Sequence, residues 1–330
     1  MNVNMRNSNI ELLRFVMMLI LCIWHILMHG YGLKHIADAS VAPTTVQLIL
    51  LALLAFPVDC FVFISGYYGI RLKREKLIRL LLQTTFFYLL CIILRNLFHI
   101  GEPVPNGLIL TNWLPLTNRA WWFIAWYSFL MLLAPIIEEG VNKLSQKRFL
   151  KILVCLIVIN NLGTWLNHLH TGSDLAGLLT VYLIGRYVSI YKKSISVAKA
   201  SVFFLLTTLT LIAILLSAQY FNKPYFTWTF LLFCNPLIVI QAISCFFFAK
   251  GLNFHNSRLI NFLGAHCFAI YLLTEFTDNQ LYNWWRLIYE MHGFCVMGIS
   301  VFVVCLFICI LDLLQSYVQK PVNLYLTRNI

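Results

Sequence analysis

Charged residues are scarce in this chain of 330 residues. Asp, Glu, Lys and Arg make up 11% of it, whereas an ordinary soluble domain carries about 25%. Hydrophobic residues make up 61%, and no polar interval is long enough to fold into a soluble domain of its own. The composition therefore excludes a soluble globular protein and predicts a single integral-membrane domain over residues 1–330.

Motifs of several common enzyme classes are also missing. The sequence has no Cys-x-x-Cys pair, no metal-spaced His/Cys cluster, no glycine-rich phosphate loop and no nucleophile elbow. Its 10 cysteines lie almost entirely inside apolar runs, where a thiol behaves as a small hydrophobic group. We therefore expect no structural disulfide, no zinc site and no metal cofactor.

Apolar runs of roughly 20 residues recur along the whole chain, and each is long enough to cross the hydrocarbon core of a bilayer. The pattern predicts an all-α, polytopic transmembrane bundle of about ten helices. The fifth run is the weakest, because Asn160, Asn161 and Gly163 interrupt it. The predicted helices cover residues 10–30, 46–70, 80–98, 121–137, 152–166, 175–190, 200–220, 227–249, 259–276 and 294–317.

The formal net charge of +12 is explained by the loops. Lys and Arg gather in alternate connections, with the densest cluster at residues 71–79, as the positive-inside rule describes for cytoplasmic loops. This pattern predicts that both termini are cytoplasmic. The basic charge is then a topology signal in a multi-pass protein whose partner is the lipid bilayer, and we expect no nucleic-acid partner.

Ionisable side chains occur in the first predicted helix, where they are costly and usually functional. Arg14 and His25 are eleven residues apart, which separates them by about 20° around a helix and about 16 Å along it. One face thus carries a cation near one membrane surface and an imidazole deep inside, with His29 one turn further. The imidazole either serves as a base or hydrogen-bonds a neighbouring helix. Glu11 is placed to pair with Arg14.

Four segments resemble the membrane acyltransferase-3 family, in order along nearly the whole chain. The specific one is the Arg-x10-His pattern formed by Arg14 and His25, and the other three corroborate it. These three are Ser65–Tyr67 followed by the arginines of 71–79, the Trp-rich segment 121–126 that leads to Leu-Ala-Pro at 133–135, and the late segment 262–273 with its Tyr-Leu pair.

Members of that family move acyl groups, mostly acetyl, from acyl-CoA to sugars. The resemblance therefore implies an acyl-CoA-dependent O-acetyltransferase of the bacterial inner membrane, acting on a hydroxyl of a cell-envelope or exported glycan. Such a reaction needs a general base, a group that stabilises the oxyanion and a binding site for the CoA phosphates. The implied catalytic residues are His25, as the general base, and Arg14, which with Arg71 and Arg74 is a donor-binding cation. The other predicted contacts are Arg79 and Ser65 for acetyl-CoA, and Asp59, Trp122, Tyr271 and Glu275 for the substrate.

The roles of three acidic residues and one arginine have alternative explanations. Relatives usually have a histidine after the late Tyr-Leu, where this chain has Thr274 and Glu275, so Glu275 or nearby Asp278 is expected to contact the acceptor hydroxyl in its place. For Asp59 and Arg186, a buried ion pair or the lining of a polar cavity explains the charge as well as a catalytic role does, and Asp59 is the better site candidate of the two.

Two other classes of function compete with the enzyme. A transporter or exporter of a polysaccharide or lipid-linked sugar is expected to have duplicated halves and broken helices; the interrupted fifth run favours it, but no repeat is visible. A sensor or membrane partner of another enzyme would use its polar residues for association. The oligomeric state is not determined by the sequence.

Overall fold

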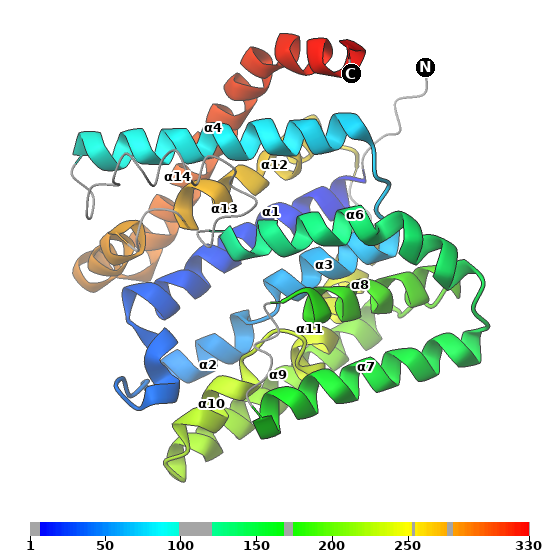
Figure 1. Cartoon of the computed structure of the whole chain (residues 1–330). Helices are drawn as coiled ribbons and strands as arrows, with labels where there is room; N and C mark the ends of the chain where they lie inside the picture. The colour runs from blue at the N-terminus through cyan, green and yellow to red at the C-terminus, as the bar shows by residue number, and fades with distance from the viewer. Residues whose placement is uncertain (1–6, 99–120, 168–173, 253–254, 276–279, 330) are drawn as a thin grey trace.

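The computed structural model describes residues 7–98, 121–167, 174–252, 255–275 and 280–329, and these residues form helices with no strand among them (Figure 1). The all-α prediction is confirmed. The elements are α1 (Ser8–His25), its π-helical continuation η1 (Ile26–Gly30), the 3-10 helix η2 (Leu33–Asp38), α2 (Thr45–Leu54), α3 (Pro57–Tyr68), α4 (Arg74–Phe98), α6 (Trp122–Asn142), α7 (Gln146–Asn167), α8 (Leu175–Ile190), α9 (Val197–Tyr220), α10 (Pro224–Phe230), α11 (Pro236–Gly251), α12 (Arg258–His266), α13 (Phe268–Glu275) and α14 (Gln280–Asn329).

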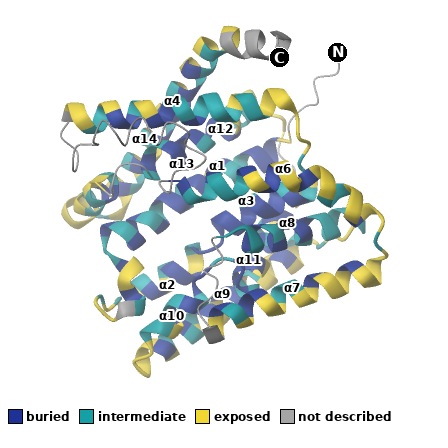
Figure 2. Cartoon of the chain, viewed as in Figure 1, coloured by how far each residue is buried: buried dark blue, intermediate teal, exposed yellow. Residues whose placement is uncertain are grey.

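In the described part of the chain, seven helical segments are long and apolar enough to cross a membrane. They are α1 with η1, α2 with α3, and α4, α6, α7, α9 and α14, while α8 and α11 are shorter apolar helices of 16 residues each. α1 and α3 are largely buried in the middle of the bundle, whereas α4, α7 and α9 turn exposed apolar side chains outward (Figure 2). This is the distribution of a multi-pass protein whose outer face contacts lipid.

Proline interrupts two of the helices that were predicted to be continuous. The run at 46–70 is two helices, because α3 begins at Pro57, which has no N–H to continue the hydrogen bonding of α2. The run at 227–249 breaks before Pro236, where the Asn235 side chain caps α11 by accepting from the backbone N–H of Leu237.

Three further predictions about helices need correction. The fifth helix is not interrupted, since α7 continues through Asn160 and Asn161. The sequence did not predict the helix that begins at Gln280; it meets the helix predicted at 294–317 at Gly293, where the backbone is not helical and φ is 79°. The run predicted at 259–276 divides into α12 and α13.

Glycine lets α3 and α8 pack backbone to backbone. A Cβ on Gly66 would lie 2.2 Å from the carbonyl oxygen of Tyr182, and one on Gly185 would lie 2.6 Å from that of Phe63. Only residues without a side chain allow this approach. Helix packing therefore explains the glycine of the Ser65–Tyr67 segment.

The connections that carry most of the Lys and Arg residues meet at one end of the bundle, which we call the basic end. The α3–α4 and α6–α7 connections lie there together, at the right in Figure 1. Gln146 at the start of α7 donates to the hydroxyl of Tyr187 near the end of α8 (3.1 Å), and Lys250 at the end of α11 donates to the hydroxyl of Tyr67 at the end of α3. Arg14 lies toward this end of α1, and His25 lies toward the other.

Candidate functional site

A cavity of about 470 Å³ opens near the basic end, between α1, α3, α4, α6 and the α12–α13 junction. This volume lies within the range typical of small-molecule sites. Four residues that the sequence predicted for donor binding or catalysis line it: Arg14, Ser65, Arg71 and Arg79. Arg74, predicted with them, lies at the exposed start of α4 and does not line the cavity.

The rim of the cavity is cationic. Lys76 lines it together with the three arginines, and no acidic residue is among the described lining residues. From the sequence, Lys76 was expected to be a positive-inside topology signal and not a site residue. A detectable pattern was present, because Lys76, Arg79 and Gln83 recur at the three- and four-residue spacing of one helix face and all three line the cavity.

A hydrogen-bonded network holds the loop that presents Arg71. Gly69 ends α3 with φ of 72°, a conformation that favours glycine. The Ile70 N–H donates to the hydroxyl of Tyr182 (3.2 Å), which itself donates to Glu138 (2.7 Å). Glu138 forms an ion pair with Arg186 (2.7 Å), and such a pair is one of the alternatives that the sequence left open for Arg186.

The inner wall of the cavity is aromatic, with a single polar link. Phe123 and Tyr127 of α6 and Phe268 of α13 line it. The hydroxyls of Ser65 and Tyr127 are 3.0 Å apart, and Ser65 donates to the carbonyl of Phe61 (3.0 Å), so the Tyr127 hydroxyl is the donor to Ser65. Ser65 thus presents a hydroxyl to the cavity wall in a fixed position.

His25 lies in a second polar cluster, at the other end of α1. Its Nδ1 is 2.9 Å from Oε2 of Glu275 and 2.9 Å from the hydroxyl of Tyr282. The Tyr282 hydroxyl also donates to Oε2 of Glu275 (3.4 Å). The structure therefore brings together His25 and Glu275, two predicted site residues from opposite ends of the sequence. Glu275 was expected to contact the acceptor hydroxyl, but here it contacts the histidine. Tyr282 was missed, because nothing in its local sequence marks it.

His29 completes this cluster. Its ring stacks on Tyr282, with centroids 5.6 Å apart, and its Nε2 is 3.8 Å from Oε1 of Glu275. The ligand atoms of His25, His29 and Glu275 all lie within 4.8 Å of one another, so this trio could hold a metal ion. The sequence could not reveal the trio, because its spacing places two members on one helix and the third far along the chain.

Two helices connect the cavity to the His25 cluster, although His25 does not line the cavity. On α1, Met18 lines the cavity and His25 follows seven residues later, about 10 Å along the helix. On α13, Phe268 and Glu275 have the same separation. Tyr271 lies between them and is buried, with its ring against Phe123 and Phe268. Apolar and aromatic side chains thus separate the cations from the imidazole.

Two other predicted substrate contacts lie elsewhere. Asp59, 3% exposed in the first turn of α3, accepts from the backbone N–H of Cys234 (3.3 Å to Oδ2) and does not line the cavity. Trp122 stacks on Phe233, with centroids 5.3 Å apart. Asp278 lies outside the described residues. For Asp59 and Trp122, the observed contacts are those of packing inside the bundle.

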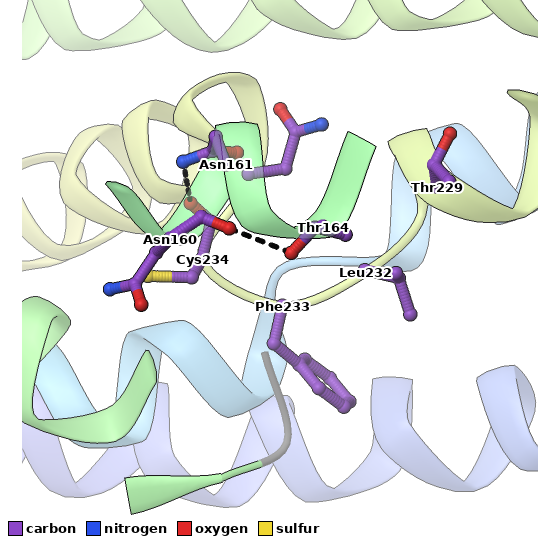
Figure 3. A pocket seen from close by; sticks show the side chains of 8 residues that line it. Asn160, Asn161, Thr164, Thr229, Leu232, Phe233 and Cys234 are labelled. Carbon is purple, nitrogen blue, oxygen red and sulfur yellow. Dashed lines mark hydrogen bonds between the residues drawn. The ribbon is translucent and has the colours of Figure 1, made fainter. Parts of the chain in front are cut away.

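The asparagines of α7 serve packing as well. Asn160 donates to Thr180 of α8 (2.7 Å), and Asn161 donates to the carbonyl of Cys234 (3.3 Å). Figure 3 shows Asn161, Thr164 and Cys234 around a small pocket of about 10 Å³, room for about one water molecule. The polar residues that favoured a transporter therefore hold α7 against its neighbours.

The comparisons with known proteins agree with the resemblance seen in the sequence. A family model described as an acyltransferase domain, that of the acyltransferase-3 family, matches residues 7–311. Searches of curated proteins and of solved structures give no match. The matched region includes the whole cationic cavity and the His25 cluster. The chain therefore belongs to the acyltransferase-3 family of membrane acyltransferases.

Proposed function

We propose that this protein is an integral-membrane O-acetyltransferase of the bacterial inner membrane. It would take acetyl from cytosolic acetyl-CoA and place it on a hydroxyl of a cell-envelope or exported glycan. One observation supports this most: Arg14, Ser65, Arg71 and Arg79, predicted from three separate parts of the sequence, line a single cavity.

The donor end of the reaction belongs to the basic end of the bundle. Arginine forks and a lysine match the charge and geometry of phosphate groups, and Arg14, Arg71, Lys76 and Arg79 line one cavity. Arg14 also pairs with Glu11 (3.5 Å), as the sequence predicted. The CoA phosphates would bind there. The pantetheine arm would extend past Met18 toward His25, carrying the thioester into the apolar interior.

His25 is the proposed general base at the other end of that path. The acceptor hydroxyl gives its proton to the imidazole as its oxygen attacks the thioester carbonyl. The tetrahedral intermediate then collapses, the C–S bond breaks, and the imidazolium returns the proton to the CoA thiolate. The products are an acetyl ester and CoA-SH, and the histidine is unchanged.

The transporter alternative loses its specific support. The continuity of α7 and the hydrogen bonds of Asn160 and Asn161 account for the residues that had favoured it. Helices do break before Pro57 and Pro236, but no repeated half accompanies these breaks among the described residues. The cationic cavity is better matched to a phosphorylated donor than to a translocation path.

Transfer of radiolabelled acetyl from acetyl-CoA to a panel of p-nitrophenyl glycosides tests the proposal with purified protein in detergent. We expect label on one or more glycosides, and a fall of roughly 10²–10⁴-fold in kcat for His25→Ala, the contribution typical of general base catalysis. Binding of acetyl-CoA should survive the substitution. Full activity of His25→Ala, or acetyl-CoA binding by the wild type without any transfer, would contradict the proposal.

A further inference from the structure

The contacts of His25 define which of its two nitrogens carries a proton at rest. The Glu275 carboxylate, 2.9 Å from Nδ1, can only accept a hydrogen bond when it is ionised. A bare Nδ1 lone pair facing it would be repelled, so Nδ1 carries the hydrogen. A neutral imidazole has one N–H, and its lone pair is then on Nε2.

The hydroxyl of Tyr282 fits this arrangement. It is 2.9 Å from Nδ1 of His25 and donates to Oε2 of Glu275 (3.4 Å). The Tyr282 hydroxyl therefore donates its hydrogen to the carboxylate of Glu275, and its oxygen accepts from the Nδ1–H of His25, together with the carboxylate. No described residue forms a hydrogen bond to Nε2 of His25, and the side chain keeps 14% of its surface exposed. Nε2 is the nitrogen available to a substrate.

The charge of Glu275 also has an unusual setting. Among the described residues its ionic partners are the two imidazoles of His25 and His29, and no Lys or Arg pairs with it. A carboxylate in a membrane interior is costly without a cation. It gains a full counter-charge when His25 takes up a proton, which on the proposed mechanism happens only as the acceptor attacks.

We propose that Glu275, assisted by Tyr282, is a positioning residue that fixes the tautomer of His25 and stabilises the imidazolium formed during acyl transfer. This inference rests on the proposed function of His25. It replaces the expectation that Glu275 contacts the acceptor hydroxyl. The underlying logic is general: a carboxylate on one imidazole nitrogen directs the other toward the reacting hydroxyl, and stabilisation realised only in the transition state raises kcat.

The test measures acetyl transfer to the glycoside that the wild type uses best. Glu275→Gln should lower kcat by roughly 10²-fold or more, with the KM and the binding of acetyl-CoA unchanged. Glu275→Asp should recover part of that loss, and Tyr282→Phe should lower kcat by a smaller factor. Glu290→Gln is the matched control, because Glu290 on α14 is exposed and its ion pair with Arg286 is long, at 4.0 Å; its activity should equal that of the wild type.

A double substitution separates this role from a structural one. If Glu275 acts through His25, adding Glu275→Gln to His25→Ala should cost nothing further, because groups that act as a unit are not additive. Additive losses, or a wild-type kcat for Glu275→Gln while His25→Ala is impaired, would overturn the inference and leave the proposed base intact. Loss of wild-type activity on chelation, restored by Zn²⁺, would overturn it in favour of a metal held by His25, His29 and Glu275. An active His25→Ala variant would instead reject the proposed function itself.

Discussion

The cavity cations differ from their neighbours in one respect that the sequence alone could not resolve. Within the segment 71–79, Arg71, Lys76 and Arg79 line the cavity, whereas Lys73 is exposed and does not. A topology signal requires only that the charges be near the membrane surface. A binding site requires that they point into the same space, and this orientation becomes visible only when α4 is packed against α1 and α3.

Arg79→Ala and Lys76→Ala should each weaken the binding of acetyl-CoA by roughly tenfold, because each removes a charge-assisted contact of about 1.5 kcal/mol. The affinity for S-acetylpantetheine, which lacks the nucleotide phosphates, should not change. Isothermal titration with both ligands measures the difference. Lys73→Ala is the matched control; an equal loss for Lys73→Ala would mean that only the general positive field matters.

At the level of single residues, the sequence indicated candidate site residues but not the residues that contact them. The helical period placed Arg14 and His25 on one face, and Arg14 lines the cavity, whereas His25 does not. The sequence could not show that Tyr282 contacts His25, because the two residues are 257 positions apart and Tyr282 belongs to no motif. Asp59 shows the opposite limit: an apolar run with one carboxylate looks the same whether that group faces a cavity or a buried backbone N–H.

Among the helix contacts, the contact between α3 and α8 restricts most strongly which residues the sequence can have. Gly66→Ala would place a methyl group 2.2 Å from a backbone oxygen, which cannot move aside as a flexible side chain could. We expect a loss of stability of about 1–3 kcal/mol or more, as in overpacked cores. The fraction of protein that remains monodisperse after heating in detergent measures it.

Gly298→Ala in α14 is the matched control, because a Cβ there meets nothing within 4 Å. Alanine is the better helix former, so this variant should be as stable as the wild type or slightly more stable. Equal stability of Gly66→Ala and Gly298→Ala would show that α3 and α8 do not approach each other as described.

The sequence predicted where most of the helices lie, but it did not predict where a helix is interrupted. Length and apolarity mark a membrane-spanning run with or without an internal break. The pattern therefore missed the breaks before Pro57 and Pro236, and it read Asn160 as an interruption of α7. A polar side chain need not interrupt a helix when it has a hydrogen-bond partner on a neighbouring helix, and Asn160 donates to Thr180.

For the molecule as a whole, the basic end predicts the orientation in the membrane. The α6–α7 connection lies at that end, whereas the turn after α9 at Asn222 lies at the other, where Gln219 donates to the carbonyl of Pro43. Alkaline phosphatase inserted after Lys143 should therefore be inactive in the cytoplasm, and insertion after Asn222 should give an active, exported enzyme. The reverse pattern would mean that the termini face the exterior and that the cationic cavity cannot receive cytosolic acetyl-CoA.

The separation between the cationic cavity and the His25 cluster has an electrical consequence. Met18 and the rings of Phe268 and Tyr271 form an insulating layer about 10 Å deep between them. Moving one elementary charge through the membrane potential takes about 2.3 kcal/mol per 100 mV. In a protein working as proposed, the CoA phosphates stay on one side of the layer, and only the uncharged pantetheine arm with its acetyl thioester crosses it. Delivery of the acetyl group is then independent of voltage, and the energy of the thioester alone drives it.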